Sequence, residues 1–173
     1  MKNMTTIPEN KLKKAAYLAK KEANRWREVA LMLSSNIRFD NEHDILLLLS
    51  SEIYLKAILF HEKGNISKGH KLNILFQQLP KHIQDEIKSN IDFKPIEISD
   101  FKTHEKGSSY ETFEEALDKI SNDFVDLRYG YEKYVEDKSL IFLNGFISEI
   151  NAQLHEIADA LVRPDVDNLS LNV

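Results

Sequence analysis

Residues 45–60 constrain the fold more than any other part of the chain, because apolar residues occupy nearly every side of the helix they would form. A helix that is apolar all round has to be buried among other elements. Asp40 and Asn41 precede this stretch as candidate N-cap residues, and Gly64 follows it as a stop signal. The sequence therefore predicts a helix over residues 40–63 at the centre of a helical bundle.

Hydrophobic periodicity predicts two shorter helices after this one and a long helix before it. Residues 11–37 carry apolar side chains in steps of three and four along one face, and several of them are alanines that let a neighbouring helix approach closely. A short helix is expected over residues 72–79, ending at Pro80, and a weaker one over residues 81–90.

The second half of the chain predicts two more long helices. Residues 112–115, Thr-Phe-Glu-Glu, have the form of a capping box and introduce an apolar stripe over 113–127. A last stripe over 143–161 ends before Pro164, whereas residues 91–110 are expected to form a long loop. The predicted fold is an all-α, antiparallel bundle of four to five main helices.

The composition is typical of one compact domain over residues 1–173, with an ordered core of about 10–163 and a flexible tail at 165–173. The chain has 173 residues, of which 42% are hydrophobic, and it has no cysteine, which excludes disulfides, thiolate metal sites and cysteine nucleophiles. No apolar run approaches the roughly 20 residues that span a bilayer. Residues 1–14 lack the apolar core of a signal peptide. We therefore expect a cytoplasmic protein that does not enter a membrane.

The net charge and the spacing of the histidines argue against two classes of function, nonspecific nucleic-acid binding and metal binding. The net charge of −5 argues against a protein that coats nucleic acid without specificity, because such binding depends on neutralising phosphates. The six histidines are never paired at helical spacing, and no Glu-x-x-His pair occurs. We expect neither a metal site nor a cofactor.

Three separated segments carry the most specific pattern: Glu52-Ile-Tyr-Leu-Lys-Ala-Ile-Leu59, Gly69-His-Lys-Leu-Asn-Ile-Leu75 and Phe124-Val-Asp-Leu-Arg-Tyr-Gly-Tyr-Glu132. Their order and spacing resemble the HEPN superfamily of small helical nucleotide- and RNA-associated domains, over roughly residues 10–162. The resemblance implies that the first segment lies in the second long helix, that the second opens the next helix and that the third follows a later one. It also implies a homodimer, and we expect the first and last long helices to form its interface.

Glu52 is the first candidate site residue, because a carboxylate among Leu48 and Leu55 on one helix face is costly to bury without a cation. Lys56 lies one helical turn on and offers a local pair. Arg128 is the alternative, because its planar guanidinium suits a buried bidentate pair and both positions recur in the family that the chain resembles. Both partners stay open, and so does the choice between a structural pair and a ligand pocket.

Catalytic HEPN ribonucleases carry an Arg, four to six residues and then a His, and cleave RNA without a metal. There the Arg would hold the scissile phosphate while the His transfers protons. Positions 133–135, after Arg128, are Lys, Tyr and Val, so the expected His is missing. The chain has one literal match, Arg38 to His43, but it falls between the first two predicted helices. A second unorthodox pair is Arg128 with His70.

The turn over residues 64–71 is a further candidate site. It lacks the lysine position and the preceding strand of a Walker motif, but Lys68, His70 and Lys71 flank helix-start amides that suit an anion. An ordinary interhelical turn is the competing interpretation. Tyr129 and Tyr131 either stack on a base or serve as packing residues.

These observations favour a noncatalytic or catalytically degenerate HEPN-like binding or regulatory protein in nucleotide or RNA biology, in a toxin–antitoxin or phage-defence context. Its ligand-binding residues are expected to be Glu52, Lys56, Lys68, His70, Lys71, Arg128, Tyr129 and Tyr131. One alternative is a metal-independent endoribonuclease that uses Arg38 with His43 or Arg128 with His70. Another is a structural helical adaptor. The expected partners are a second copy of the chain, an RNA or nucleotide, and a nucleotidyltransferase-like protein.

Overall fold

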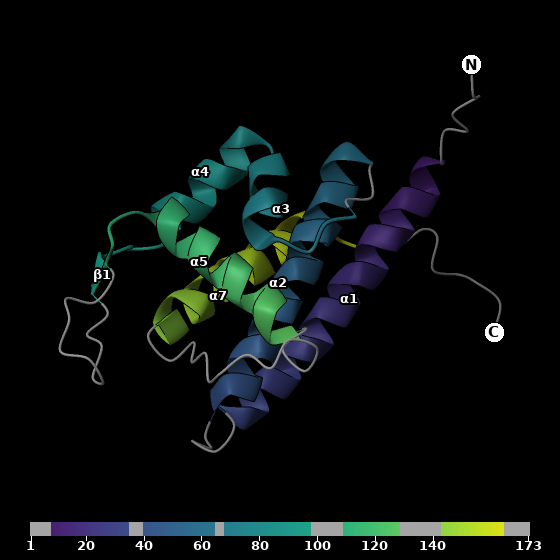
Figure 1. Cartoon of the computed structure of the whole chain (residues 1–173). Coiled ribbons are helices and arrows are strands. Elements are labelled where there is room, and N and C mark those ends of the chain that lie inside the picture. The colour runs from purple at the N-terminus through teal and green to yellow at the C-terminus, as the bar shows by residue number, and fades with distance from the viewer. Residues whose placement is uncertain (1–7, 35–39, 65–67, 98–108, 129–142, 165–173) are drawn as a thin grey trace.

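The chain folds into a helical bundle in a computed structural model. The structure describes residues 8–34, 40–64, 68–97, 109–128 and 143–164. Within these ranges the long helices are α1 (Glu9–Leu33), α2 (Asp40–Lys63), α5 (Phe113–Arg128) and α7 (Asn144–Leu161), and the shorter ones are α3 (Leu72–Gln78) and α4 (Lys81–Asn90) (Figure 1). The predicted all-α bundle is confirmed.

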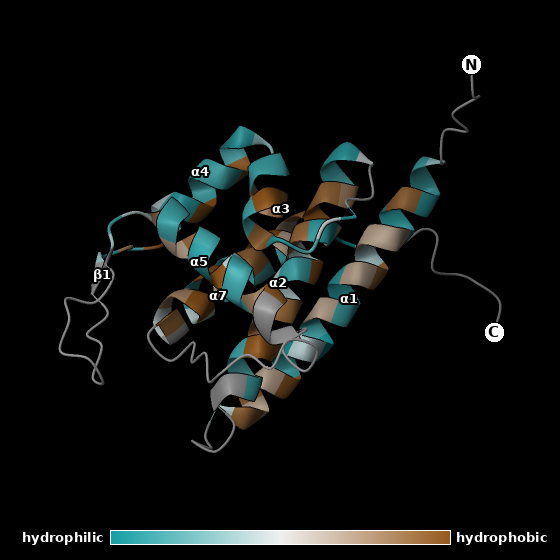
Figure 2. Cartoon of the chain, in the orientation of Figure 1, coloured by the Kyte–Doolittle hydropathy of each residue, from teal (hydrophilic) through white to brown (hydrophobic). Residues whose placement is uncertain are grey.

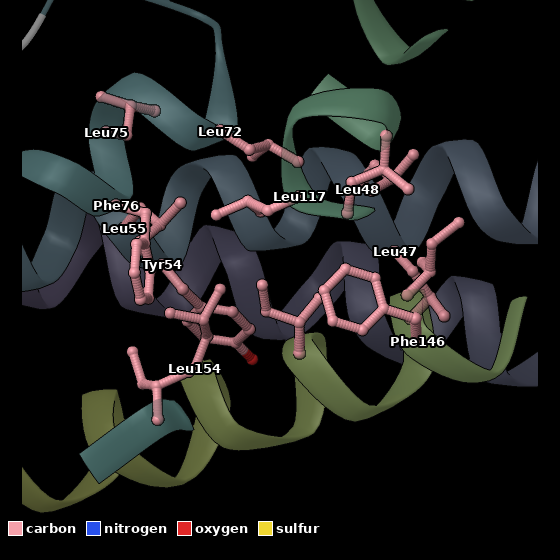
Figure 3. Close-up of a cluster of buried hydrophobic side chains, with 14 of the residues drawn as sticks. Leu47, Leu48, Tyr54, Leu55, Leu72, Leu75, Phe76, Leu117, Phe146 and Leu154 are labelled. Carbon is pink, nitrogen blue, oxygen red and sulfur yellow. The ribbon is translucent and has the colours of Figure 1, made fainter. Parts of the chain in front are cut away.

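Helix α2 is the central element, as its all-round apolar sequence predicts. It packs against α1, α3, α5 and α7. Its Leu48, Leu55 and Ile58 are at most 1% exposed, and burying each such side chain contributes about 1.5–3 kcal/mol. Figure 3 shows leucines of α2 in one cluster with Leu72 and Leu117 from neighbouring helices. Much of the apolar stabilisation of the fold therefore depends on this helix.

Helices α1 and α2 form a closely packed antiparallel hairpin (Figure 1). The contact stripe of α1 consists of Ala16, Ala23 and Ala30, which are seven residues apart and fully buried. The hydroxyl of Ser50 on α2 donates a hydrogen bond of 2.9 Å to the backbone carbonyl of Ala23. Only small side chains allow a hydroxyl of one helix to reach the backbone of the other, so the alanine spacing sets the distance between these helices.

Helix α7 packs on α2 and runs in the same direction. The amide of Asn151 donates to the carbonyl of Leu47 at 3.0 Å and to the hydroxyl of Ser51 at 2.9 Å. Further along both helices, the hydroxyl of Tyr54 lies 3.0 Å from Nδ1 of His155. Residue numbers rise together along the two helices, which gives a parallel pair inside a bundle whose first two helices are antiparallel.

The predicted signals at two helix ends are confirmed. Gly64 has a φ of 60° at the end of α2, where its amide donates to the carbonyl of Phe60 at 3.0 Å. The backbone amide of Glu115 donates to the Thr112 hydroxyl at 3.2 Å, and the carboxylate of Glu115 accepts from the Thr112 amide at 3.2 Å. The capping box therefore closes the start of α5 as the sequence indicates.

Two predicted boundaries differ from the structure. The expected loop over residues 91–110 contains two short strands, β1 (Ile96–Glu97) and β2 (Ser109–Tyr110), which pair antiparallel with Ile96 opposite Tyr110. Strands of two residues are too short for an alternating pattern to reveal them. The first helix begins two residues earlier than predicted, and residues 35–37 at its expected end lie outside the described ranges. So do the expected flexible tail and the side chains of Asp40 and Asn41.

Four phenylalanines join α3, α5 and α7 to the segment that follows α4. The ring centroid of Phe113 lies 5.4 Å from that of Phe76 and 5.3 Å from that of Phe146. The ring centroids of Phe93 and Phe146 are 5.5 Å apart. The pairs are tilted or edge-to-face, geometries worth about 0.5–1.5 kcal/mol each beyond their burial. This cluster fixes the short helices against the long ones.

In the described ranges, no helix combines the length and the apolar character that crossing a bilayer requires. Figure 2 shows polar residues on much of α4 and α5, whereas α1 alternates between apolar and polar stretches along its length.

Candidate functional site

The carboxylate of Glu52 forms the centre of the candidate site. Glu52 is 3% exposed in the middle of α2. Its Oε1 accepts a hydrogen bond of 2.6 Å from Nζ of Lys56 and lies 2.9 Å from Nδ1 of His70. Two of the three segments that carry the HEPN resemblance, 52–59 and 69–75, therefore meet at one carboxylate oxygen.

Local sequence explains how these groups converge. Lys56 follows Glu52 by one turn on α2, so both side chains lie on the same face of that helix. His70 belongs to the segment between Gly64, which ends α2, and Lys71, the residue preceding α3. The turn thus returns the chain beside the helix that it has just left. The expected local pair of Glu52 with Lys56 is present, and the contact with His70 was not predicted.

The pairing determines which nitrogen of His70 faces a ligand. An ionised carboxylate only accepts hydrogen bonds, so Nδ1 of His70 carries the hydrogen that Glu52 accepts. Any proton transfer between this imidazole and a ligand must then use Nε2. The side chain of His70 is 44% exposed and that of Lys56 is 20% exposed, whereas the carboxylate that orients both is buried. The cluster therefore presents two oriented nitrogen groups at the surface.

Neighbouring lysines differ in their surroundings. Nζ of Lys71 donates to the side-chain oxygen of Asn122 on α5 at 3.1 Å. Lys68 is exposed, and no described residue pairs with it. Helix α3 has only seven residues, so its start offers a weaker dipole to an anion than a long helix would. Of the expected anion-binding side chains, His70 and Lys71 thus already have partners in the protein.

Several predicted site residues fall outside the described parts of the chain. Arg38, Tyr129 and Tyr131 lie outside the described ranges, and Arg128 is described only as the last backbone position of α5. The pairs Arg38–His43, Arg128–His70 and Glu52–Arg128 therefore stay predictions. The structure does describe His43, whose Nδ1 lies 2.9 Å from Oδ1 of Asp44.

Sequence reasoning missed a polar cluster where α1, α2 and α7 meet. The hydroxyl of Tyr54 donates to the side-chain oxygen of Asn24 at 2.6 Å and lies 3.0 Å from Nδ1 of His155. On α7, His155 approaches Asp159 at 3.7 Å, and Asp159 pairs with Lys20 at 3.0 Å. A tyrosine within the apolar stretch of α2 was the only available signal, because its partners are distant in the sequence.

Burial controls ionisation in this cluster. Desolvation raises the pKa of Tyr54 to about 12 and lowers the pKa of His155 from its ordinary 6.5. The positive charge of Arg27 lowers both pKa values, so it opposes burial at Tyr54 and reinforces it at His155. Nε of Arg27 is buried without a hydrogen-bond partner among the described residues.

Metal binding has no support in the part of the chain that the structure describes, where no group of three or more His, Asp or Glu side chains is arranged to hold an ion. Comparison with known proteins adds no further assignment: no family model, no curated protein and no solved structure matches this chain.

Proposed function

We propose that this chain is a noncatalytic, HEPN-like binding or regulatory protein whose ligand is RNA or a nucleotide. The observation that carries the proposal is the convergence of Glu52, Lys56 and His70. Segments 52–59 and 69–75, which both carry the family-like pattern, contribute polar residues to one hydrogen-bonded cluster.

The chemistry of the cluster suits a phosphate or a base edge. A buried carboxylate holds an imidazole and an ammonium group at the surface, and both groups donate hydrogen bonds when charged. Lys68 adds a positive charge on the same turn. The absence of a His four to six residues after Arg128 supports a binding role rather than cleavage by the family's usual pair.

The test is a binding measurement with a matched pair of histidine variants. Purified protein is titrated with tRNA, mRNA fragments and a panel of nucleotides, using fluorescence anisotropy and ligand-induced changes in melting temperature. We expect His70→Ala to weaken binding and His82→Ala to leave it unchanged, because His82 is exposed on α4 away from the cluster. No binding to any member of the panel would contradict the proposal and favour a structural adaptor.

A metal-independent endoribonuclease is the second candidate, and the contact between Glu52 and His70 favours it. A carboxylate that fixes the imidazole tautomer is a common support for a general base. We expect such an enzyme to cleave tRNA or mRNA in EDTA and to lose activity in His70→Ala and in Arg128→Ala. Loss of activity in His43→Ala, with activity kept in His70→Ala and Arg128→Ala, would instead indicate the Arg38–His43 pair. Cleavage that survives all three variants would point to a contaminant.

We also propose that the chain forms a homodimer through α1. Leu18, Val29 and Met32 are 54%, 42% and 76% exposed, and their spacing of eleven and three residues puts them on one side of the helix. This side lies opposite the alanine stripe that contacts α2. The exposed ion pair of Glu22 and Arg25 lies between Leu18 and Val29 on the same side, so the proposed interface combines apolar contacts with charged ones.

Light scattering tests the dimer at micromolar concentrations. We expect the wild-type chain at dimer mass and the double variant Leu18→Glu with Met32→Glu at monomer mass. Ile74→Glu is the matched control, because Ile74 is an exposed apolar residue on α3. Wild-type protein at monomer mass throughout would contradict the proposal.

A further inference from the structure

A cleft of about 640 Å³ opens between α3, α4 and α5, apart from the Glu52 cluster. Its lining includes Phe76, Gln77, Gln84, Tyr110, Leu117 and Asp118. Phe76 and Leu117 supply buried apolar surface, and side chains of four amides and three acids surround it. Its size lies in the range of pockets that hold a small ligand or a few residues of a peptide.

Asp118 is a charged group that two side-chain amides orient in this cleft. Its Oδ1 accepts a hydrogen bond of 2.6 Å from the amide of Asn73, and its Oδ2 accepts one of 3.1 Å from the amide of Asn122. The two donors come from α3 and α5, so the carboxylate is fixed between helices. Each oxygen keeps accepting capacity for a second donor.

Asp118 and Glu115 are the two acids of the lining that have no cationic partner among the described residues, and the carboxylate of Glu115 is already used to cap the start of α5. Lys88 pairs with Glu114, and Lys119 pairs with Asp123, so both lysines of the lining already have acidic partners. Asp118 is exposed, and no cationic side chain of the described residues lies within ion-pair distance of it. The lining thus has an oriented negative charge that a ligand can neutralise.

We propose that this cleft binds a basic segment of a partner protein and that Asp118 receives an arginine side chain. A guanidinium group donates two parallel hydrogen bonds, which match the two fixed oxygens of one carboxylate. Its planar face also suits the partly exposed ring of Tyr110 in the lining. The amides of Gln77 and Gln84 offer donors and acceptors to a peptide backbone.

The same charges disfavour a nucleic acid in this cleft. A phosphate would meet Asp118 and Glu115, while the lysines beside them are held by Glu114 and Asp123. The inference therefore goes beyond the proposed RNA or nucleotide site, whose Lys71 reaches the edge of the cleft at Asn122.

The experiment uses three small probes and two variants of the full chain. Nα-acetyl-arginine amide, its uncharged isostere Nα-acetyl-citrulline amide, and guanosine monophosphate are titrated by two-dimensional NMR. The side-chain amide signal of Asn73 reports on the cleft, because this amide donates to Asp118, whereas Asn122 also contacts Lys71 of the proposed nucleotide site. We expect the arginine probe to shift the Asn73 signal in a saturable way.

Removal of either charge should weaken binding by about tenfold or more, the usual scale for a lost charge-assisted hydrogen-bonded pair. The variant Asp118→Asn removes the negative charge from the protein. Citrulline lacks the positive charge of arginine, so it removes the ligand's charge without any mutation. Glu86→Gln on α4 is the matched control, because Glu86 is exposed and does not line the cleft. Equal binding of arginine and citrulline, or a shift at Asn73 with guanosine monophosphate alone, would overturn the proposal.

Discussion

At the scale of single residues, Glu52 illustrates how burial turns an ordinary side chain into an organising group. The carboxylate is 3% exposed and holds two nitrogen donors that are themselves partly exposed. Removing one partner of a buried, hydrogen-bonded charge costs more than a surface pair contributes, because the remaining charge stays desolvated. The side chain of His70 therefore matters for stability as well as for the proposed binding.

A double-mutant cycle measures the link between Glu52 and His70. We expect the unfolding free energies of Glu52→Gln, His70→Ala and the double variant to give a coupling of about 0.5–3 kcal/mol. The reason is that Glu52→Gln removes the negative charge from the acceptor of the 2.9 Å contact, whereas His70→Ala removes its donor. In the control cycle, Glu52→Gln with His82→Ala, the effects should add. Additive effects in the first cycle would show that the contact contributes nothing.

Gly64 provides a second residue-scale prediction. It has a φ of 60°, and a Cβ placed there would lie 2.9 Å from Cδ1 of Leu12. We expect Gly64→Ala to destabilise the protein by about 1–2 kcal/mol in chemical denaturation, mainly because an L-residue adopts this left-handed conformation with strain. Gly145→Ala is the control, because Gly145 is in α7 and a Cβ there meets nothing within 4 Å. This substitution should be neutral or stabilising, and a similar loss in both variants would exclude the conformational explanation.

At the scale of elements, the α1–α2 hairpin depends on the small size of its contact residues. Replacing Ala23 by Leu would insert a large side chain where Ser50 reaches the backbone at 2.9 Å. We expect Ala23→Leu to destabilise by about 1–3 kcal/mol, the range for overpacking. The exposed Ala160 on α7 is the control, and Ala160→Leu should change the unfolding free energy by less than about 0.5 kcal/mol. Equal changes in unfolding free energy for Ala23→Leu and Ala160→Leu would mean that the contact between α1 and α2 does not require a small residue at position 23.

Individual elements were also the part of the fold that sequence could predict. The alanine spacing, the capping box at Thr112 and the stop at Gly64 are local signals, and the structure confirms each of them. The β1–β2 pair was missed because two residues carry no period. The partner His70 of Glu52 was missed because nothing in the sequence fixes where the turn after α2 returns.

At the scale of the whole molecule, three helices are joined by contacts that no local pattern reveals. Tyr54 on α2 connects to Asn24, 30 residues earlier, and to His155, 101 residues later. The parallel arrangement of α2 and α7 follows from these contacts and from Asn151. Such a junction depends on how all the helices pack together, so it becomes visible only in the folded chain.

The junction should make stability depend on pH through His155. Tyr54 donates its single hydroxyl hydrogen to Asn24, so Nδ1 of His155 donates to the Tyr54 oxygen, while burial and the charge of Arg27 disfavour a second proton on the ring. The pKa of His155 is thus lower in the folded chain than its ordinary 6.5. Between these two pKa values the unfolded chain binds more protons, so protonation favours unfolding.

We therefore expect the unfolding free energy to fall as the pH is lowered through 6.5 toward the folded-state pKa of His155, and this contribution to level off below it. Above pH 6.5 the contribution is fully present. Urea denaturation across this range should show a smaller slope for His155→Gln than for the wild type, because the variant has no ring to protonate. His82→Ala, which leaves the junction intact, should keep the wild-type slope. Parallel pH profiles for the wild type and His155→Gln would show that burial of this imidazole at the junction does not affect its protonation.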